Sequence, residues 1–122
     1  MNSFPFERAS HVYPAGTLLA VRVSGLYDHV GLATGYGTVI HSSRRNKRVI
    51  EDDVSLFSGG RPVRTVPYAS SLSGTEVVVR ARMKIGQPYN VLVRNCEHFV
   101  SWCISGEARS RQLGLLDPRR IF

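Results

Sequence analysis

Hydrophobic and polar residues in the first half of the chain follow the patterns of β-strands. Residues 17–23 (TLLAVRV) are apolar and β-branched, and turn-forming residues flank them on both sides. Residues 27–34 and 38–42 enclose the turn-prone residues 35–37 (GYG), which predicts an antiparallel hairpin. The first half is therefore expected to be rich in strands.

The segment after the hairpin is expected to be less regular. The basic run 44–48 (RRNKR) is predicted to be a loop that enters a short strand. Residues 55–60 are expected to form an irregular turn in which Leu56 and Phe57 anchor the core. Residues 62–68 (PVRTVPY) are expected to form another short strand, limited in length by its second proline.

Two segments in the second half have the features of helices. Residues 73–76 (SGTE) have the spacing of a capping box, and the helix that they begin would end at Gly86. The valine run 77–79 is also compatible with a strand.

The second predicted helix begins near Asn95, a good N-cap residue, and Gly106 can end it. Residues at helical spacing form one stripe that is expected to face the core: Cys96, Phe99, Val100, Cys103 and Ile104. Cys96 is the first member of this stripe. Its thiol is therefore expected at the helix N-terminus, directed toward the body of the protein.

The length and the cysteine content limit the architecture and the compartment. We expect the 122 residues to form a single domain, 1–122, because two separate cores would need a longer chain. No apolar run is long enough for a spanning helix, and the first residues lack the pattern of a secretory signal.

Cys96 and Cys103 would lie about 10 Å apart on one helix, beyond disulfide reach. We expect either two reduced thiols in a reducing compartment or one reactive and one structural thiol, and a cytoplasmic location.

The charge suggests anionic partners. Sixteen Lys and Arg against nine Asp and Glu give a net charge of +7. A field of this sign favours nucleic acid, anionic lipid headgroups or acidic protein surfaces without choosing among them. Arg44, Arg45, Lys47 and Arg48 could hold the protein at the surface of an anionic membrane, or could form an ordinary solvated loop.

Two histidines of the predicted hairpin are expected to meet. His29 and His41 are equidistant from Gly35, so a turn centred there would make them cross-strand neighbours on one face. Gly31 and Ala33 on the same face would leave room for another element to approach. We expect that element to be the N-terminus of the second helix.

Such an arrangement suits nucleophilic catalysis. The helix dipole and a neighbouring imidazolium would stabilise the thiolate of Cys96. His29 would then act as the base, and His41 would fix its ring orientation. Backbone N–H groups at the start of the helix are available to bind an oxyanion.

The same residues have other interpretations. Cysteines on apolar helical stripes are usually small buried hydrophobes, which suits Cys103 better than Cys96. The histidine pair could be purely structural. A metal site is a further alternative, although the sequence lacks the ligand spacings that are typical of zinc sites. Its ligands would be His29, His41, Cys96 and His98.

A family resemblance favours the catalytic interpretation. Residues 95–100 (NCEHFV) resemble the signature of the lecithin retinol acyltransferase-like, or NC-domain, family. Residues 27–32 (YDHVGL) and 39–41 (VIH) are similar to the family's H-box, with both histidines at its separation. The resemblance extends from about residue 14 to about residue 112.

The resemblance implies an α+β fold of the permuted papain-like NlpC type, with an antiparallel sheet packed against helices and the nucleophile at a helix N-terminus. Cys96 matches the family nucleophile, His29 the general base and His41 the third, polar member of the triad. The implied activity is acyl transfer or hydrolysis on glycerophospholipid or another acyl substrate through a thioester, without metal or organic cofactor. An amidase or peptidase of the NlpC type and a non-catalytic regulatory module remain alternatives, and nucleic-acid binding is the least favoured.

Overall fold

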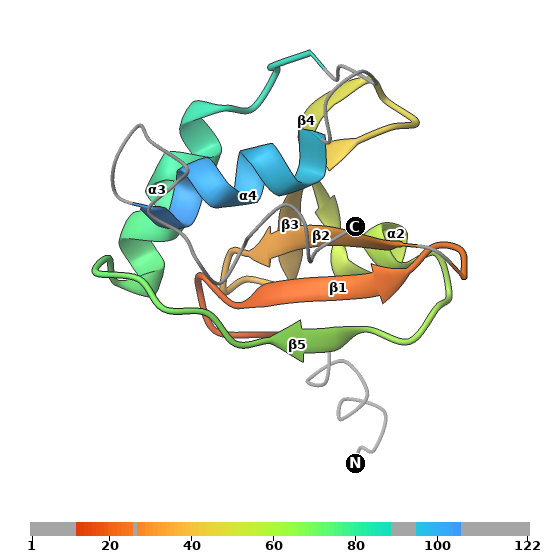
Figure 1. Cartoon of the computed structure of the whole chain (residues 1–122), viewed down its shortest axis with the longest axis horizontal. Helices are drawn as coiled ribbons and strands as arrows, with labels where there is room; N and C mark the ends of the chain where they lie inside the picture. The colour runs from red at the N-terminus through yellow and green to blue at the C-terminus, as the bar shows by residue number, and fades with distance from the viewer. Residues whose placement is uncertain (1–11, 26, 89–94, 106–122) are drawn as a thin grey trace.

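The computed structural model describes residues 12–25, 27–88 and 95–105, the side chains of 95–97 excepted. Its centre is an antiparallel sheet of five strands in the order β4-β3-β2-β1-β5 (Figure 1). The strands are β1 (Leu18–Arg22), β2 (Asp28–Ala33), β3 (Thr38–Ser43), β4 (Arg48–Asp53) and β5 (Arg64–Val66). The helices are α2 (Val54–Ser58), α3 (Gly74–Met83) and α4 (Asn95–Ser105). The predicted α+β fold, with an antiparallel sheet packed against helices, is confirmed.

The predicted hairpin is formed by β2 and β3. Its turn contains Gly35 and Gly37, whose φ angles of 96° and 84° lie in the region that glycine tolerates best. Tyr36 between them is 85% exposed. The basic segment after β3 forms the tight turn into β4, as predicted, and Lys47 in this turn also has a positive φ of 62°.

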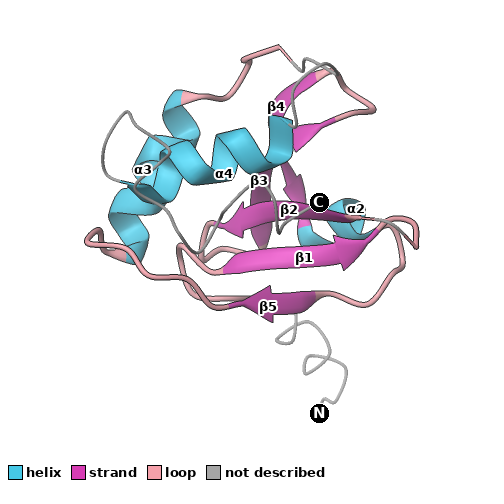
Figure 2. Ribbon diagram, in the orientation of Figure 1, coloured by secondary structure: helices cyan, strands magenta, loops and turns pink. Residues whose placement is uncertain are grey.

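One face of the sheet is covered by α3 and α4, which lie side by side (Figure 2). The apolar residues that these helices contribute are Val77, Val78, Ala81, Phe99, Val100, Cys103 and Ile104. They contact strand residues such as Leu18, Val30 and Ile40. The predicted core stripe of the last helix is thus confirmed for its four members from residue 99 on, whereas the side chain of Cys96 lies outside the described residues.

The opposite face has a smaller core under α2. This core contains Leu19, Val21, Ala33, Val39, Val54 and Phe57. The expected irregular turn is in fact a one-turn helix followed by Gly59 and Gly60, both with positive φ. Residues three apart in a helical turn lie on the same side, so Phe57 faces the core together with Val54 and is 5% exposed. Leu56 faces away from the core and is 64% exposed. The prediction that Leu56 anchors the core was wrong.

The capping box predicted for the first long helix is present, and α3 excludes the strand alternative. The Ser73 hydroxyl accepts a hydrogen bond from the backbone N–H of Glu76 at 3.1 Å, and the Glu76 carboxylate accepts one from the backbone N–H of Ser73 at 2.8 Å. The helix ends at Met83, slightly before the expected terminus at Gly86. Within the described ranges, no helix combines the length and apolar character needed to cross a membrane.

Candidate active site

His29 on β2 and His41 on β3 are hydrogen-bonded to each other. The distance between Nε2 of His29 and Nδ1 of His41 is 2.8 Å, and the ring planes meet at 78°. The predicted proximity of the two rings on one face of the hairpin is confirmed.

The histidines are diagonal neighbours, not the directly opposite pair that was expected. The register pairs Leu32 with Ile40, so the turn is centred on Tyr36 instead of Gly35. Two threonines set this register: the backbone N–H of Thr34 donates to the carbonyl of Thr38 at 3.0 Å, and their hydroxyls lie 2.6 Å apart. Shifting the turn centre by a whole residue offsets the pairing by two positions. Because side chains alternate between faces with a period of two, both rings stay on the same face.

Phe57 of α2 approaches Gly31, the position where the N-terminus of the last helix was expected. A Cβ atom at Gly31 would lie 3.0 Å from Cε1 of Phe57, 3.0 Å from Cβ of His41 and 2.6 Å from Cγ1 of Val39. The Phe57 ring in turn contacts both imidazoles, with centroid distances of 5.3 Å to His29 and 5.2 Å to His41. The absent side chain at Gly31 thus lets Phe57 support the histidine pair.

Replacing Gly31 with alanine should lower the free energy of unfolding by about 1–3 kcal/mol, because the new methyl group overlaps packed neighbours on both sides. Urea denaturation would measure the change. Gly25→Ala is the matched control, since a Cβ at Gly25 would meet no atom within 4 Å. Equal stabilities for the two variants would contradict this account of the packing.

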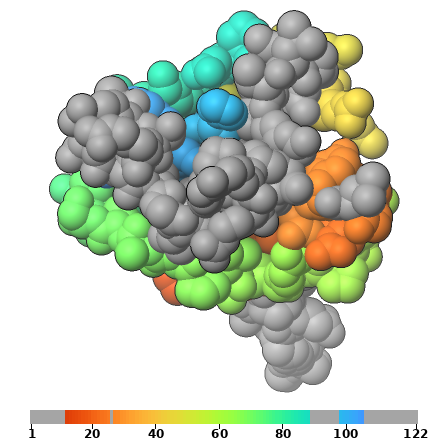
Figure 3. Space-filling view, viewed as in Figure 1, coloured from red at the N-terminus to blue at the C-terminus, as the bar shows by residue number. Residues whose placement is uncertain are grey.

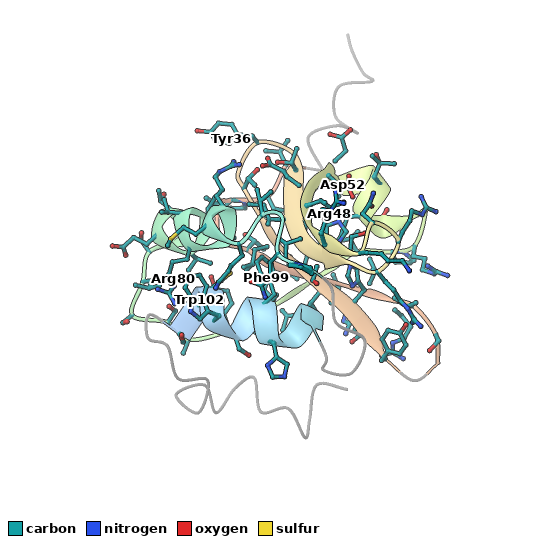
Figure 4. The ribbon with its side chains drawn as sticks, turned by 90° about the horizontal axis from the view of Figure 1, so that it is seen from above. Tyr36, Arg48, Asp52, Arg80, Phe99 and Trp102 are labelled. Carbon is teal, nitrogen blue, oxygen red and sulfur yellow. The ribbon has the colours of Figure 1, made fainter. Side chains whose placement is uncertain are left out.

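Asp52 on β4 extends the histidine pair, and the sequence analysis missed it. Its Oδ2 lies 3.0 Å from Nε2 of His41. The register of β3 and β4 pairs Asp52 with Val39, which places the carboxylate on the same face as His41. Figure 4 shows Asp52 beside α2 and away from Phe99 of α4. A signal was present in the sequence, because Asp52 is the one of three consecutive acidic residues with the right strand parity, but using it required the β3–β4 register.

The three groups define the direction of the hydrogen bonds. A carboxylate only accepts, so Nε2 of His41 carries a proton and donates it to Asp52. In a neutral His41, Nδ1 then accepts from the Nε2–H of His29. This leaves the lone pair on Nδ1 of His29 unused within the trio. The Asp52 carboxylate therefore selects the tautomer in which His29 has a basic nitrogen available.

Burial keeps both rings neutral near pH 7. Desolvation, together with the charge that His41 would carry, lowers the pKa of His29 to about 4. Burial also lowers the pKa of His41, an effect that the hydrogen bond and charge of Asp52 oppose. Neutral rings are the state that the tautomer assignment requires.

Acidification should destabilise the fold through His29. Below a pH of about 6.5 the unfolded chain binds a proton at this position, whereas the folded protein resists it until about pH 4. The resulting loss is about 2 kcal/mol at pH 5 relative to pH 7. Denaturation at the two pH values should show that acidification lowers the free energy of unfolding of wild type by this amount more than that of His29→Gln. An identical pH dependence for both proteins would contradict the assigned burial.

Cys96 lies in the first turn of α4, which begins at Asn95, so the predicted cysteine does stand at a helix N-terminus. Its side chain is outside the described residues. Farther along α4, Phe99 and Val100 pack on the face of the sheet opposite to His29. The side chain of Asn95, which would form the predicted cap, and the Gly106 terminus also fall outside the described part.

Cys103 is the structural cysteine that the sequence suggested. It is fully buried, and desolvation raises the pKa of its thiol to about 12, against the opposing charges of Arg80 and Lys84. Arg80 donates to the carbonyl oxygens of Trp102 and Cys103, and its guanidinium lies 3.9 Å from the centroid of the Trp102 ring (Figure 4). These contacts bind α3 to the end of α4.

The histidine pair and Asp52 open into a cavity of about 560 Å³. One wall is apolar and includes Val21, Val23, Leu56 and Phe57, while the rim carries Arg44, Arg45 and Arg61. In the described ranges, no group of three or more His, Cys, Asp or Glu side chains is arranged to hold a metal ion. The site thus offers a neutral base with an available nitrogen beside a partly apolar, partly basic cavity.

Comparison of the sequence with known proteins identifies a family. The profile of the lecithin retinol acyltransferase family matches residues 11–109, which include both histidines, Asp52 and the NCEHFV segment. Among curated proteins, none matches the chain. Because the family profile covers most of the sequence, the resemblance noted in the H-box and cysteine segments is confirmed, and the chain belongs to the lecithin retinol acyltransferase family.

Proposed function

We propose that this protein is a thiol acyltransferase or phospholipase-type hydrolase that transfers an acyl group from glycerophospholipid, or a related acyl ester, through a thioester on Cys96. Family membership supports an acyltransferase- or hydrolase-type activity in general. The observation that carries the finer proposal is the His29–His41–Asp52 chain of hydrogen bonds, which leaves a basic nitrogen free at a cavity.

In the first half-reaction, Nδ1 of His29 takes the proton of the Cys96 thiol, and the thiolate attacks the ester carbonyl. Backbone N–H groups at the start of α4 would stabilise the oxyanion. When the tetrahedral intermediate collapses, the bond to the alcohol breaks and His29 returns the proton to the departing oxygen. The products are a free alcohol and an acyl thioester.

In the second half-reaction, water, an amine or an alcohol attacks the thioester while His29 accepts its proton. Collapse of this intermediate releases the acyl product and returns the proton to the sulfur of Cys96. His41 and Asp52 act through His29: they hold its ring and stabilise the imidazolium that forms in each step. A thiolate beside His29 would raise its pKa from the low value that burial produces, which favours the ion pair.

Membrane access is a further part of the proposal. Residues 44–48, which form the turn between β3 and β4 and the first position of β4, are exposed and carry four positive charges. Arg44, Arg45, Lys47 and Arg48 would place a cytoplasmic protein at an anionic membrane surface by electrostatic attraction.

The proposal is tested by supplying the protein with mixed phospholipid vesicles and, in parallel, with a panel of peptides. Release of fatty acid and lysophospholipid that depends on Cys96 and His29 is the expected result. Peptide cleavage with the same dependence would replace this proposal by an NlpC-type peptidase. If neither substrate is consumed by folded protein, the regulatory alternative gains support.

The two cysteines should differ in reactivity. We expect iodoacetamide at pH 7 to modify Cys96 at least about 10-fold faster than Cys103, whose thiol is buried and has a raised pKa. Peptide mapping over time would measure both rates. His29→Gln should slow the labelling of Cys96 alone. Equally slow labelling of both thiols would argue against an activated nucleophile.

A further inference from the structure

The basic rim of the cavity suggests what kind of acyl ester it takes. Arg44 and Arg45 belong to the turn between β3 and β4, and Arg61 follows α2. The turn between β3 and β4 and the turn after α2 thus bring arginines to the same cavity as His29 and His41. The turn between β3 and β4, yellow, projects at the edge of the molecule (Figure 3).

These arginines differ from Arg22, Arg64 and Arg82, which are paired with carboxylates. Arg22 and Arg64 are paired with Asp28, and Arg82 is paired with Glu51. The guanidinium groups of Arg45 and Arg61 have no hydrogen-bond or ion-pair partner among the described residues, and Arg44 contacts only the hydroxyl of Tyr27, at 3.4 Å. The three guanidinium groups at the rim of the cavity therefore have no carboxylate to neutralise them.

The cavity contains little negative charge to offset them. Its one acidic lining residue is Asp52, and Oδ2 of this carboxylate already accepts a hydrogen bond from His41. Arginine is the side chain best suited to phosphate, because its planar donors bind two oxygens at once. A phosphate group would supply the charge that this rim lacks.

Both turns are held in place by their own hydrogen bonds. The hydroxyl of Ser43 accepts from the backbone N–H of Asn46 at 3.0 Å and donates to its side-chain oxygen at 3.0 Å. The backbone N–H of Arg61 donates to the carbonyl of Ser58 at 3.1 Å. The arginines are thus carried by fixed backbone on two sides of the cavity, which reduces the entropy lost on binding.

The rest of the lining completes an amphipathic site. Val21, Val23, Leu56 and Phe57 give an apolar wall next to the histidines. An acyl chain would lie on this wall, its ester would face His29, and a charged group beyond the ester would reach the arginines.

We infer that the cavity selects acyl esters with an anionic phosphate headgroup over zwitterionic ones, and that Arg44, Arg45 and Arg61 bind the phosphate. This inference rests on the proposed function and adds a preference to it. A choline headgroup would bring an ammonium group toward three guanidinium groups, whereas a phosphoglycerol headgroup brings only negative charge.

The test uses short-chain phospholipids below their micelle concentration, so that attraction to a membrane surface plays no part. Calorimetry with the full chain carrying Cys96→Ala would compare dihexanoyl phosphatidylglycerol, dihexanoyl phosphatidylcholine and inorganic phosphate. We expect the phosphatidylglycerol to bind most tightly. Arg45→Gln and Arg61→Gln should each weaken its binding at least about 10-fold, the usual effect of losing a hydrogen-bonded charge.

Arg22→Gln is the matched control. It removes the same charge from the end of β1, is exposed and does not line the cavity, and Asp28 keeps its ion pair with Arg64. Binding by this variant should stay within about twofold of the parent, and the melting temperatures of all three variants should agree. Equal weakening by Arg22→Gln, or tighter binding of the phosphatidylcholine, would overturn the inference.

The inorganic phosphate arm separates a lipid site from a simple anion site. Weaker binding of phosphate than of the lipid, with the same dependence on Arg45 and Arg61, is expected. Equal affinity for phosphate and for the lipid would overturn the assignment to an acyl ester. An oligonucleotide is titrated as well: if it binds more tightly than the lipid, and if all three variants weaken its binding, the site would bind nucleic acid instead. Because binding is measured in Cys96→Ala, it stands apart from catalysis: a protein that binds but never turns over lipid would refute the proposed function alone.

Discussion

Replacing Cys96 with alanine should lower the turnover number on phospholipid by at least about 10³-fold. The proposed reaction forms a covalent bond to the sulfur, and without it neither half-reaction has a pathway, so only slow background hydrolysis remains. Fatty-acid release from vesicles at saturating lipid, followed over time, would measure the loss. Cys96 stands in the first turn of α4, ahead of Phe99 and the other residues through which this helix packs in the core, so the variant should still fold.

Cys103→Ala provides the comparison within the same helix. Cys103 is buried in the core formed by the sheet, α3 and α4, so this variant should lose stability while the folded protein keeps its turnover number. Turnover that survives Cys96→Ala, or that disappears in folded Cys103→Ala, would show that the wrong thiol has been identified.

Replacing Asp52 with asparagine should reduce kcat about 10- to 100-fold with little change in KM. An amide can donate to Nε2 of His41, which would move the proton of that ring to Nδ1. His41 would then donate to Nε2 of His29, and the remaining proton of His29 would occupy Nδ1, the nitrogen that must accept from the thiol. In this variant His29 would therefore be held in the tautomer that cannot accept the proton of the thiol.

A structural role alone would not change tautomers, so the readouts include the ring nitrogens. Nitrogen NMR of the imidazoles should show the exchange of protonated positions in Asp52→Asn, and the pH–rate profile should shift. Asp53→Asn is the matched control, because Asp53 is exposed and has the opposite strand parity. Unchanged tautomers with full activity in Asp52→Asn would exclude Asp52 as a positioning residue.

Much of the fold follows from local sequence patterns. The strands β1 to β3 and the capping box of α3 were predictable because alternation, turn glycines and the serine–glutamate spacing are local signals. The helix α2 was not, because one turn is too short to show a helical period, and the exposure of Leu56 depended on recognising it.

The site was predictable only in part, for reasons of register. The shared face of His29 and His41 survived a displaced turn centre because the displacement preserved strand parity. Asp52 and Arg61 depend on how β4 and α2 are placed against the hairpin, which is long-range information that motif spacing does not contain. The assignment of the catalytic thiol stays a prediction.

The central claim is an acyl thioester on Cys96, and intact mass spectrometry tests it most directly. The protein would be incubated with phospholipid vesicles and stopped in acid, which preserves a thioester. The account predicts a mass increase equal to one fatty acyl group less one hydrogen, located on Cys96 by peptide mapping and absent in Cys96→Ala and His29→Gln. Lipid consumption by wild type without any adduct, or an adduct that persists in Cys96→Ala, would contradict it.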